Sequence, residues 1–235
     1  MEAIFYIIKT LISILVVIVP LFLIVAYVTY SERKIIGFMQ SRMGPMRVGP
    51  SGLLQPIADV LKLVSKEIII PTNANKGIFL TAPMLMLIPS LMVWSVIPLS
   101  EYFIISNINA GLLFILALTS LSVYGAVLAG TSSNSKFALL GGTRASAQMI
   151  SYEVFMGLAL MGVFMVYGTT RVSGIVNGQN EYWFGNLLPM WGIFTQPLGF
   201  ILFFTALVAE TKRAPFDAPE GGSEIVAGYF LEYSG

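Results

Sequence analysis

The sequence TLISILVVIVPLFLIVAYVTYS, at residues 10–31, contains no charged side chain. It is longer than the roughly 20 residues that a helix needs to cross the hydrocarbon core of a bilayer. Charge-free runs of similar or greater length follow at residues 77–100, 102–135 and 182–209. Across the 235 residues 56% are apolar and 11% charged, whereas a soluble domain has about a quarter of its residues charged. The sequence therefore predicts an all-α, polytopic transmembrane helical bundle.

Hydropathy and helix breakers together predict five membrane spans. We expect these spans near residues 4–30, 78–99, 110–130, 147–169 and 190–209. The first is too long for the apolar segment of a secretory signal peptide, which has about 7 to 15 residues. We interpret residues 1–235 as a single membrane domain, with a cytoplasmic amphipathic loop at 31–77 and an acidic cytoplasmic loop at 210–235.

The basic residues indicate the orientation of these spans. Seven of them lie in residues 31–77, two between the third and fourth spans, and two after the fifth. The opposite face has Arg171 in a loop and Lys9 near the N-terminus. Because cytoplasmic loops carry an excess of Lys and Arg, we expect the N-terminus outside a bacterial cell inner membrane. A mitochondrial inner membrane, with the basic face toward the matrix, is the alternative.

The sequence has no cysteine and no histidine. Disulfides, iron–sulfur ligation, the usual zinc sites and bis-histidine haem ligation are therefore excluded. We expect no cofactor bound covalently or through a metal ligand, so any redox chemistry belongs to a bound molecule or to a neighbouring protein. The net charge of +1 gives no indication of a nucleic-acid partner.

The first cytoplasmic loop predicts a surface for a lipid-soluble ligand. Its Gly/Pro-rich residues 44–52 precede apolar residues at helical spacing over 53–64, which is typical of an amphipathic helix lying on a membrane. Asp59 and Lys62 are three residues apart and should face one another on that helix. Fixed charges beside an apolar surface suit a ligand with a polar head. A helix that only packs on the bundle, or a polybasic loop that binds anionic lipid, remains open.

Two carboxylates lie within or at the end of predicted spans. Glu153 is about two turns into the fourth span, and Glu210 closes the fifth. A charge at the centre of a bilayer costs at least about 2.5 to 3.5 kcal/mol, so it is retained mainly beside a polar cavity or as a relay. The alternative is an interfacial carboxylate that extends to water or pairs with a base, such as Lys212 or Arg213 beside Glu210.

The tail interleaves acidic residues with aromatic and aliphatic ones. Its carboxylates are Asp217, Glu220, Glu224 and Glu232. Half-buried carboxylates near one another have raised and separated pKa values, which is the property that proton transfer near neutral pH requires. We interpret the tail as part of a proton path, with a solvated acidic loop as the alternative. Its spacing is not that of an EF-hand calcium loop.

Short motifs recur in order along the chain. They are SERK at 31–34, RMGP at 42–45, VGP at 48–50, GLLQP at 52–56, SYE at 151–153, AET at 209–211, RAPFD at 213–217 and EIVAGY at 224–229. Together they closely resemble the family of the H-type membrane subunit (chain 1) of proton-pumping NADH:quinone oxidoreductase, respiratory complex I. The resemblance runs from about residue 31 to the last residue.

The resemblance implies a subunit at the heel of the membrane arm, where it seals the quinone chamber and begins the proton path. Quinone is then a substrate, while NAD, FMN and Fe–S clusters belong to partner subunits. The implied partners are the peripheral-arm quinone-site subunits, the small and antiporter-like membrane subunits, and membrane lipid. The implied quinone-binding residues are Arg33, Arg42, Asp59, Lys62 and Arg213. The implied proton path comprises Glu153, Glu210, Asp217, Glu220, Glu224 and Glu232.

The sequence departs from the family at three points. Gly222 stands where the family usually has another acid, which predicts a link of the acidic path that is missing or replaced by water. Lys212 stands where asparagine is common. Family members resemble eight-span proteins, so this chain has the pattern of a truncated eight-span fold.

Three other functions fit part of the pattern. A homologous membrane subunit of an energy-converting hydrogenase would use the same acidic path without quinone. A secondary transporter or channel would bind a coupling ion at Glu153 and Glu210, but the sequence has neither inverted repeats nor paired broken helices. A structural anchor would tolerate neutralisation of every acidic residue. We predict a proton-translocating NADH:quinone oxidoreductase subunit, which catalyses nothing by itself.

Overall fold

The computed structural model describes residues 2–100, 103–183, 188–213, 215–219, 221 and 226–233. The chain divides into a first unit, Met1–Ile69, and a second unit, Ile70–Tyr233. The interpretation of the whole chain as a single membrane domain stays a prediction.

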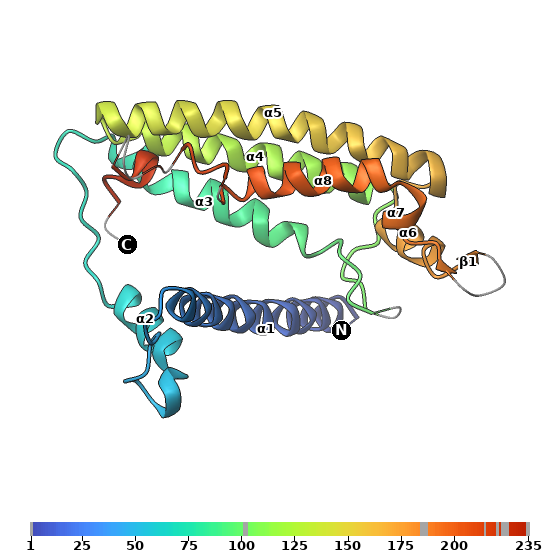
Figure 1. Cartoon of the computed structure of the whole chain (residues 1–235), viewed down its shortest axis with the longest axis horizontal. Coiled ribbons are helices and arrows are strands. Elements are labelled where there is room, and N and C mark those ends of the chain that lie inside the picture. Colours follow the sequence, from blue (N-terminus) through green and yellow to red (C-terminus); the bar gives the residue numbers. More distant parts are fainter. Residues whose placement is uncertain are drawn as a thin grey trace. The chain divides into compact units, whose positions relative to one another are not determined.

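The first unit is built on one long helix, α1 (Glu2–Met39) (Figure 1). The helix continues nine residues beyond the predicted span, which ended at residue 30. The reason is that Ser31–Lys34 end the apolar run but not the helix, because Glu, Arg and Lys are good helix formers. Hydropathy marks the apolar part of a helix and not its last turn.

After α1 the chain turns through the 3₁₀ turn η1 (Pro50–Gly52) into the short helix α2 (Gln55–Val64). Gly52 has a φ of 81°, and a Cβ there would lie 2.1 Å from the carbonyl oxygen of Pro45. Only glycine fits this turn without strain. Pro56 lies in the first turn of α2, where its missing N–H costs nothing. The predicted short helix in this loop is therefore confirmed.

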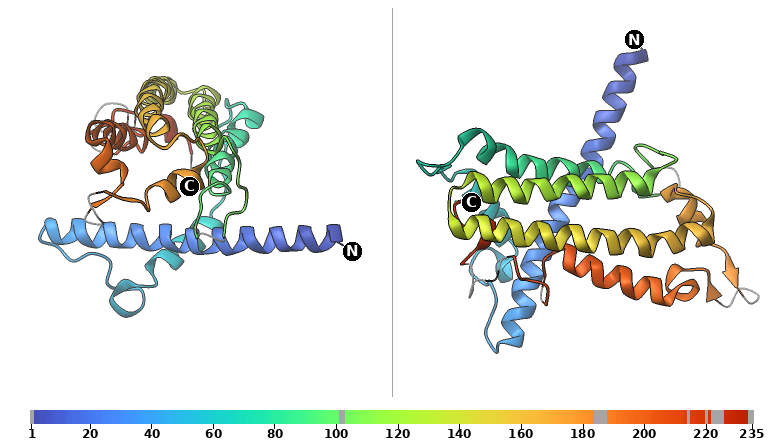
Figure 2. Two further views of the ribbon diagram at one scale, coloured as in Figure 1. Left: turned by 90° about the vertical axis from the view of Figure 1, so that its right-hand side faces the viewer. Right: turned by 90° about the horizontal axis from the view of Figure 1, so that it is seen from above.

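The second unit is a layer of four helices with small elements at its ends. The helices are α3 (Lys76–Val93), α4 (Gly111–Ser132), α5 (Lys136–Tyr167) and α8 (Pro197–Glu210). In Figure 2, α4 lies beside α3 and α5 lies between α4 and α8. Between α5 and α8 come α6 (Val172–Gly178), the antiparallel pair β1 (Tyr182–Trp183) and β2 (Leu188–Pro189), and α7 (Gly192–Thr195). The tail adds the 3₁₀ turn η2 (Gly228–Phe230), which packs on α4 and α5.

Small residues bring the helices of the second unit close together. Its buried cluster comprises Ala82, Ala126, Ala129, Ala145 and Tyr229. A Cβ on Gly130 would lie 2.6 Å from the carbonyl oxygen of Ala138. In lipid, where apolar side chains gain little from leaving the solvent, close backbone packing of this kind is what holds helices together.

Among the described residues, four helices are long and apolar enough to cross a membrane: Ile4–Met39, Lys76–Val93, Gly111–Ser132 and Lys136–Tyr167. This confirms the predicted polytopic helical fold. The fifth predicted span, at 190–209, is divided at Gln196, which has φ −142° and ψ 68°. Gln196 precedes Pro197, and proline disfavours the helical conformation in the residue before it. The 14 residues of α8 reach about 21 Å, short of the roughly 30 Å hydrocarbon core.

Two glycines of α5 provide a test of this packing. A Cβ on Gly141 would lie 2.5 Å from Cα of Gly228, whereas a Cβ on Gly157 would meet nothing within 4 Å. We expect Gly141→Ala to destabilise the protein by about 1–3 kcal/mol, because η2 must move away from α5. The matched variant Gly157→Ala should leave stability unchanged or slightly raised. The midpoint of thermal unfolding in detergent measures both, and equal midpoints for the two variants would contradict this packing.

Candidate functional site

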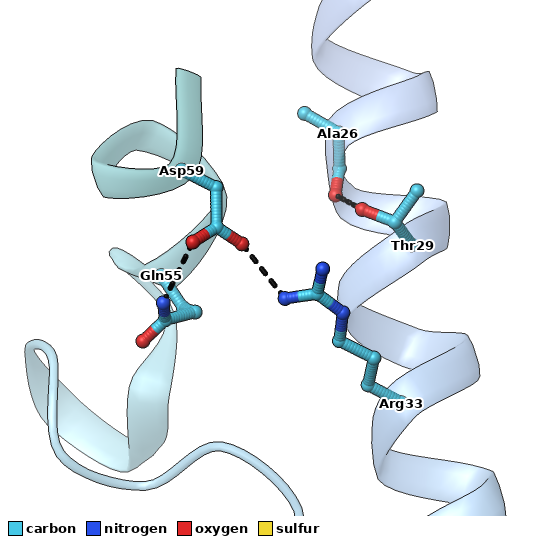
Figure 3. Close-up of polar contacts among 5 residues, drawn as sticks. All are labelled: Ala26, Thr29, Arg33, Gln55 and Asp59. Carbon is cyan, nitrogen blue, oxygen red and sulfur yellow. Dashed lines mark hydrogen bonds and ion pairs between the residues drawn. The ribbon is translucent and has the colours of Figure 1, made fainter. Parts of the chain in front are cut away.

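In the first unit, Arg33 of α1 and Asp59 of α2 form an ion pair (Figure 3). The Arg33 Nη1 atom lies 2.7 Å from Oδ2 of Asp59. The Gln55 amide donates to Oδ1 of Asp59 at 2.9 Å. The sequence paired Asp59 with Lys62, but the structure gives its two oxygens to Arg33 and Gln55. The difference arises because α2 folds back beside α1, a contact that helical spacing alone does not report.

These neighbours hold the pKa of Asp59 below its usual value of 3.8. The hydrogen bond from Gln55 is the largest cause, followed by the hydrogen bond from Arg33, while Lys62 adds a weaker attraction. Because the native pKa is lowered, the pair stabilises the fold fully above pH 3.8. That stabilisation is lost as the pH falls through the lowered native value. Asp59 is therefore a fixed negative charge at neutral pH.

A hollow of about 340 Å³ lies next to this ion pair, lined by Arg33, Ile36, Arg42, Gly44 and Pro45. The Arg42 Nε atom donates to Oε1 of Gln40 at 2.7 Å. The volume is within the range of about 300–1,000 Å³ that is usual for small-ligand pockets. Two guanidinium groups beside apolar atoms can donate hydrogen bonds to carbonyl oxygens of an otherwise apolar ligand. Arg33, Arg42 and Asp59 are thus brought together as the sequence predicts.

In the second unit, Glu153 of α5 accepts hydrogen bonds from hydroxyl groups of α4. Ser120 Oγ donates to Oε1 of Glu153, and Thr119 Oγ1 donates to the same atom at 3.3 Å. The two hydroxyl groups also donate to the carbonyl oxygen of Leu116 in their own helix. Hydroxyl groups both donate and accept, so they can hold Glu153 in either protonation state.

Glu210, the last residue of α8, lies near Glu153. The electrostatic field at its carboxyl group comes from Glu153 and Lys212. Its Oε2 atom is buried and has no hydrogen-bond partner in the described part of the chain. A buried carboxylate oxygen without a partner is costly. This burial argues against a side chain that simply extends to water, and it favours a group that takes up a proton or binds a water molecule.

Gln148 connects α5 to the end of α8. Its Nε2 atom donates to the carbonyl oxygen of Ala209 at 2.9 Å and to that of Phe216 at 2.8 Å. Four residues along α5, the Tyr152 ring meets the Phe216 ring edge-on, with 5.4 Å between centroids. The sequence motifs include Gln148 but assign it no role, because a lone amide in a span gives no signal of its partners.

The tail is held on the helices by tyrosines. Lys212 donates to the hydroxyl group of Tyr229, and its Nζ atom lies 4.5 Å from the ring centroid. Tyr229 itself is only 1% exposed. The Tyr233 ring stacks on Phe79 of α3 at 4.1 Å, and its hydroxyl group donates to the Phe79 carbonyl oxygen. Burial raises the pKa of Tyr233 above its usual 10.0, so this phenol stays a donor at neutral pH.

The other predicted residues are less closely gathered. Asp217 is exposed, whereas Glu232 is half-buried beside η2. Arg213 is exposed, and its carbonyl oxygen accepts from the N–H of Phe216 in the turn after α8. The predictions for Glu220, Glu224 and Gly222 lie outside the described residues.

A family model described as NADH dehydrogenase matches residues 12–235. The chain belongs to this family. The H-type subunit of the NADH-quinone oxidoreductase of Cupriavidus pinatubonensis is 51% identical to this NADH dehydrogenase family chain over 237 residues. That alignment covers 96% of the chain and 64% of the relative, so the chain spans less than two thirds of the length of the curated relative it matches. The resemblance drawn from the motifs is confirmed.

The ion pair of the first unit can be tested by charge reversal and charge swap. Arg33→Asp places two acids together, so α2 should detach from α1, and the double variant with Asp59→Arg should restore the contact. Because exposed ion pairs are weak, we expect amide hydrogen exchange at residues 55–64 to rise by no more than about fivefold in the single variant. Unchanged exchange in the single variant would contradict the pairing.

Proposed function

We propose that this chain acts as the H-type membrane subunit of a proton-translocating NADH:quinone oxidoreductase. In this role it forms part of the quinone-binding chamber and couples quinone reduction to proton translocation through a buried acidic path. The observation that carries the proposal is the proximity of Glu153 and Glu210, with a buried oxygen of Glu210 left unpartnered among the described residues. The family match and the name of the 51% identical relative support it.

The chain has no residue that could carry electrons through a metal, because it has neither cysteine nor histidine. In the proposal, the electrons come from NAD, FMN and Fe–S centres of partner subunits. The chain sits in a cell inner membrane with its N-terminus outside, among peripheral-arm, small and antiporter-like subunits and lipid. Quinone is its substrate.

Arg33 and Arg42 line the hollow in which the quinone head group would be held. Their guanidinium groups donate to the quinone oxygens, and this interaction strengthens as the oxygens gain negative charge on reduction. Asp59 keeps Arg33 oriented by accepting its N–H at 2.7 Å. Lys62 and Arg213 complete the proposed set of quinone-chamber residues.

The acidic pair responds to this change of charge. Two carboxyl groups in mutual reach, in surroundings of low dielectric, cannot both be ionised without cost, so a new negative charge nearby favours uptake of a proton by one of them. In the proposal a proton passes between Glu210 and Glu153, with Asp217, Glu220, Glu224 and Glu232 supplying the path from the cytoplasmic side. Moving one charge against 100 mV requires about 2.3 kcal/mol.

Neutralising either carboxyl group tests the proposal. Glu153→Gln or Glu210→Gln removes the titrating group and keeps the side-chain volume, so NADH-driven proton translocation and quinone reduction should fall together by at least about tenfold, as for loss of a proton-transfer group. The measurement is acidification of inverted native-membrane vesicles, normalised to assembled complex. Glu181→Gln, the same change at an exposed loop residue, is the matched control. Full activity of both variants with intact assembly would refute the acidic path.

A further inference from the structure

We infer that Gln148 is the positioning residue of the acidic pair, because its amide ties the last peptide of α8 to α5 and so holds Glu210 in reach of Glu153. This inference rests on the proposed function and adds a residue to it. Gln148 does not titrate and lies on α5 itself, 61 residues from one of its partners and 68 from the other.

The first bond acts directly on Glu210. The carbonyl group of Ala209 belongs to the same planar peptide as the N–H of Glu210. Gln148 donates to that carbonyl oxygen at 2.9 Å, and Ala209 is fully buried. The amide therefore fixes the peptide plane from which the Glu210 side chain starts. Carbonyl groups at the end of a helix lack intrahelical partners, so this end of α8 would otherwise be free to fray.

The second bond fixes the turn that follows α8. Gln148 donates to the Phe216 carbonyl oxygen at 2.8 Å, and Tyr152, on the same face of α5, holds the Phe216 ring. The turn is thus held at both of its ends by one side of α5. It also carries Lys212, which together with Glu153 sets the electrostatic field at Glu210. Gln148 consequently controls the separation of the three charged groups.

A neutral amide suits this task. A lysine or arginine could also donate to both carbonyl groups, but it would place another positive charge beside two carboxyl groups and lower their tendency to take up protons. The interaction of two charges varies inversely with their separation. A displacement of the α8 end therefore changes how strongly Glu153 and Glu210 oppose each other's ionisation, with no change in the charges themselves.

The test uses Gln148→Met in the intact complex. Methionine keeps the volume and removes both donors, so we expect NADH-driven proton translocation to fall ~3- to 10-fold, which corresponds to the loss of one to two hydrogen bonds. The pH at which translocation is half-maximal should also shift, whereas a variant that only lowers the amount of folded complex scales the curve without moving it. The matched control is Ser151→Ala, since Ser151 is exposed and its hydroxyl group bonds only within α5, to Ala147.

Native gels of the vesicles give the amount of assembled complex. If Gln148→Met does not assemble, Gln148→Asn serves instead, because its amide is one methylene shorter and cannot reach both carbonyl groups. An unchanged pH midpoint with loss only in proportion to assembly overturns the inference, as does wild-type translocation. Glu210→Gln separates the two claims: normal translocation in that variant refutes the proposed function, whereas loss there with a normal Gln148→Met refutes only the positioning role.

Discussion

Close contact between α4 and α5 is the constraint on which the acidic site depends. The helices are antiparallel, and a Cβ on Gly130 would lie 2.6 Å from the Ala138 carbonyl oxygen, while a Cβ on Gly142 would lie 3.1 Å from that of Ala126. About three turns further along both helices, the same register places Ser120 opposite Glu153. A larger residue at Gly130 would separate the helices and withdraw the hydroxyl groups from the carboxylate. The glycines thus determine whether Glu153 has partners.

The same face of the bundle receives the tail. Tyr229 and Tyr233 pack against α3, α4 and α5, and Lys212 is held by the hydroxyl group and ring of Tyr229. Gln148 closes the other side by binding the end of α8. Contacts between segments that are far apart in the sequence therefore enclose Glu210. A half-buried carboxyl group in such surroundings responds strongly to a neighbouring charge, because little solvent screens it.

Much of the fold could be predicted from the sequence because hydropathy reports membrane spans directly. The four long helices follow from their apolar runs, and Pro197 carried a signal for the break at Gln196 that a hydropathy window averages out. The site was only partly predictable. Arg33, Asp59, Glu153 and Glu210 are marked by their charge, but the partners of Asp59 depend on the fold of the loop. Gln148 is neutral and binds residues more than 60 positions away, so no local pattern could indicate its role.

The proposed acidic path requires Glu210 to change its protonation when quinone is reduced. Infrared difference spectroscopy of the membrane-bound complex, recorded before and after reduction of quinone, measures this change most directly. We expect a carboxyl C=O difference band that is present in the wild type and in Glu181→Gln and absent in Glu210→Gln. An identical spectrum in Glu210→Gln, with the complex assembled and quinone reduced, would contradict the proposed path.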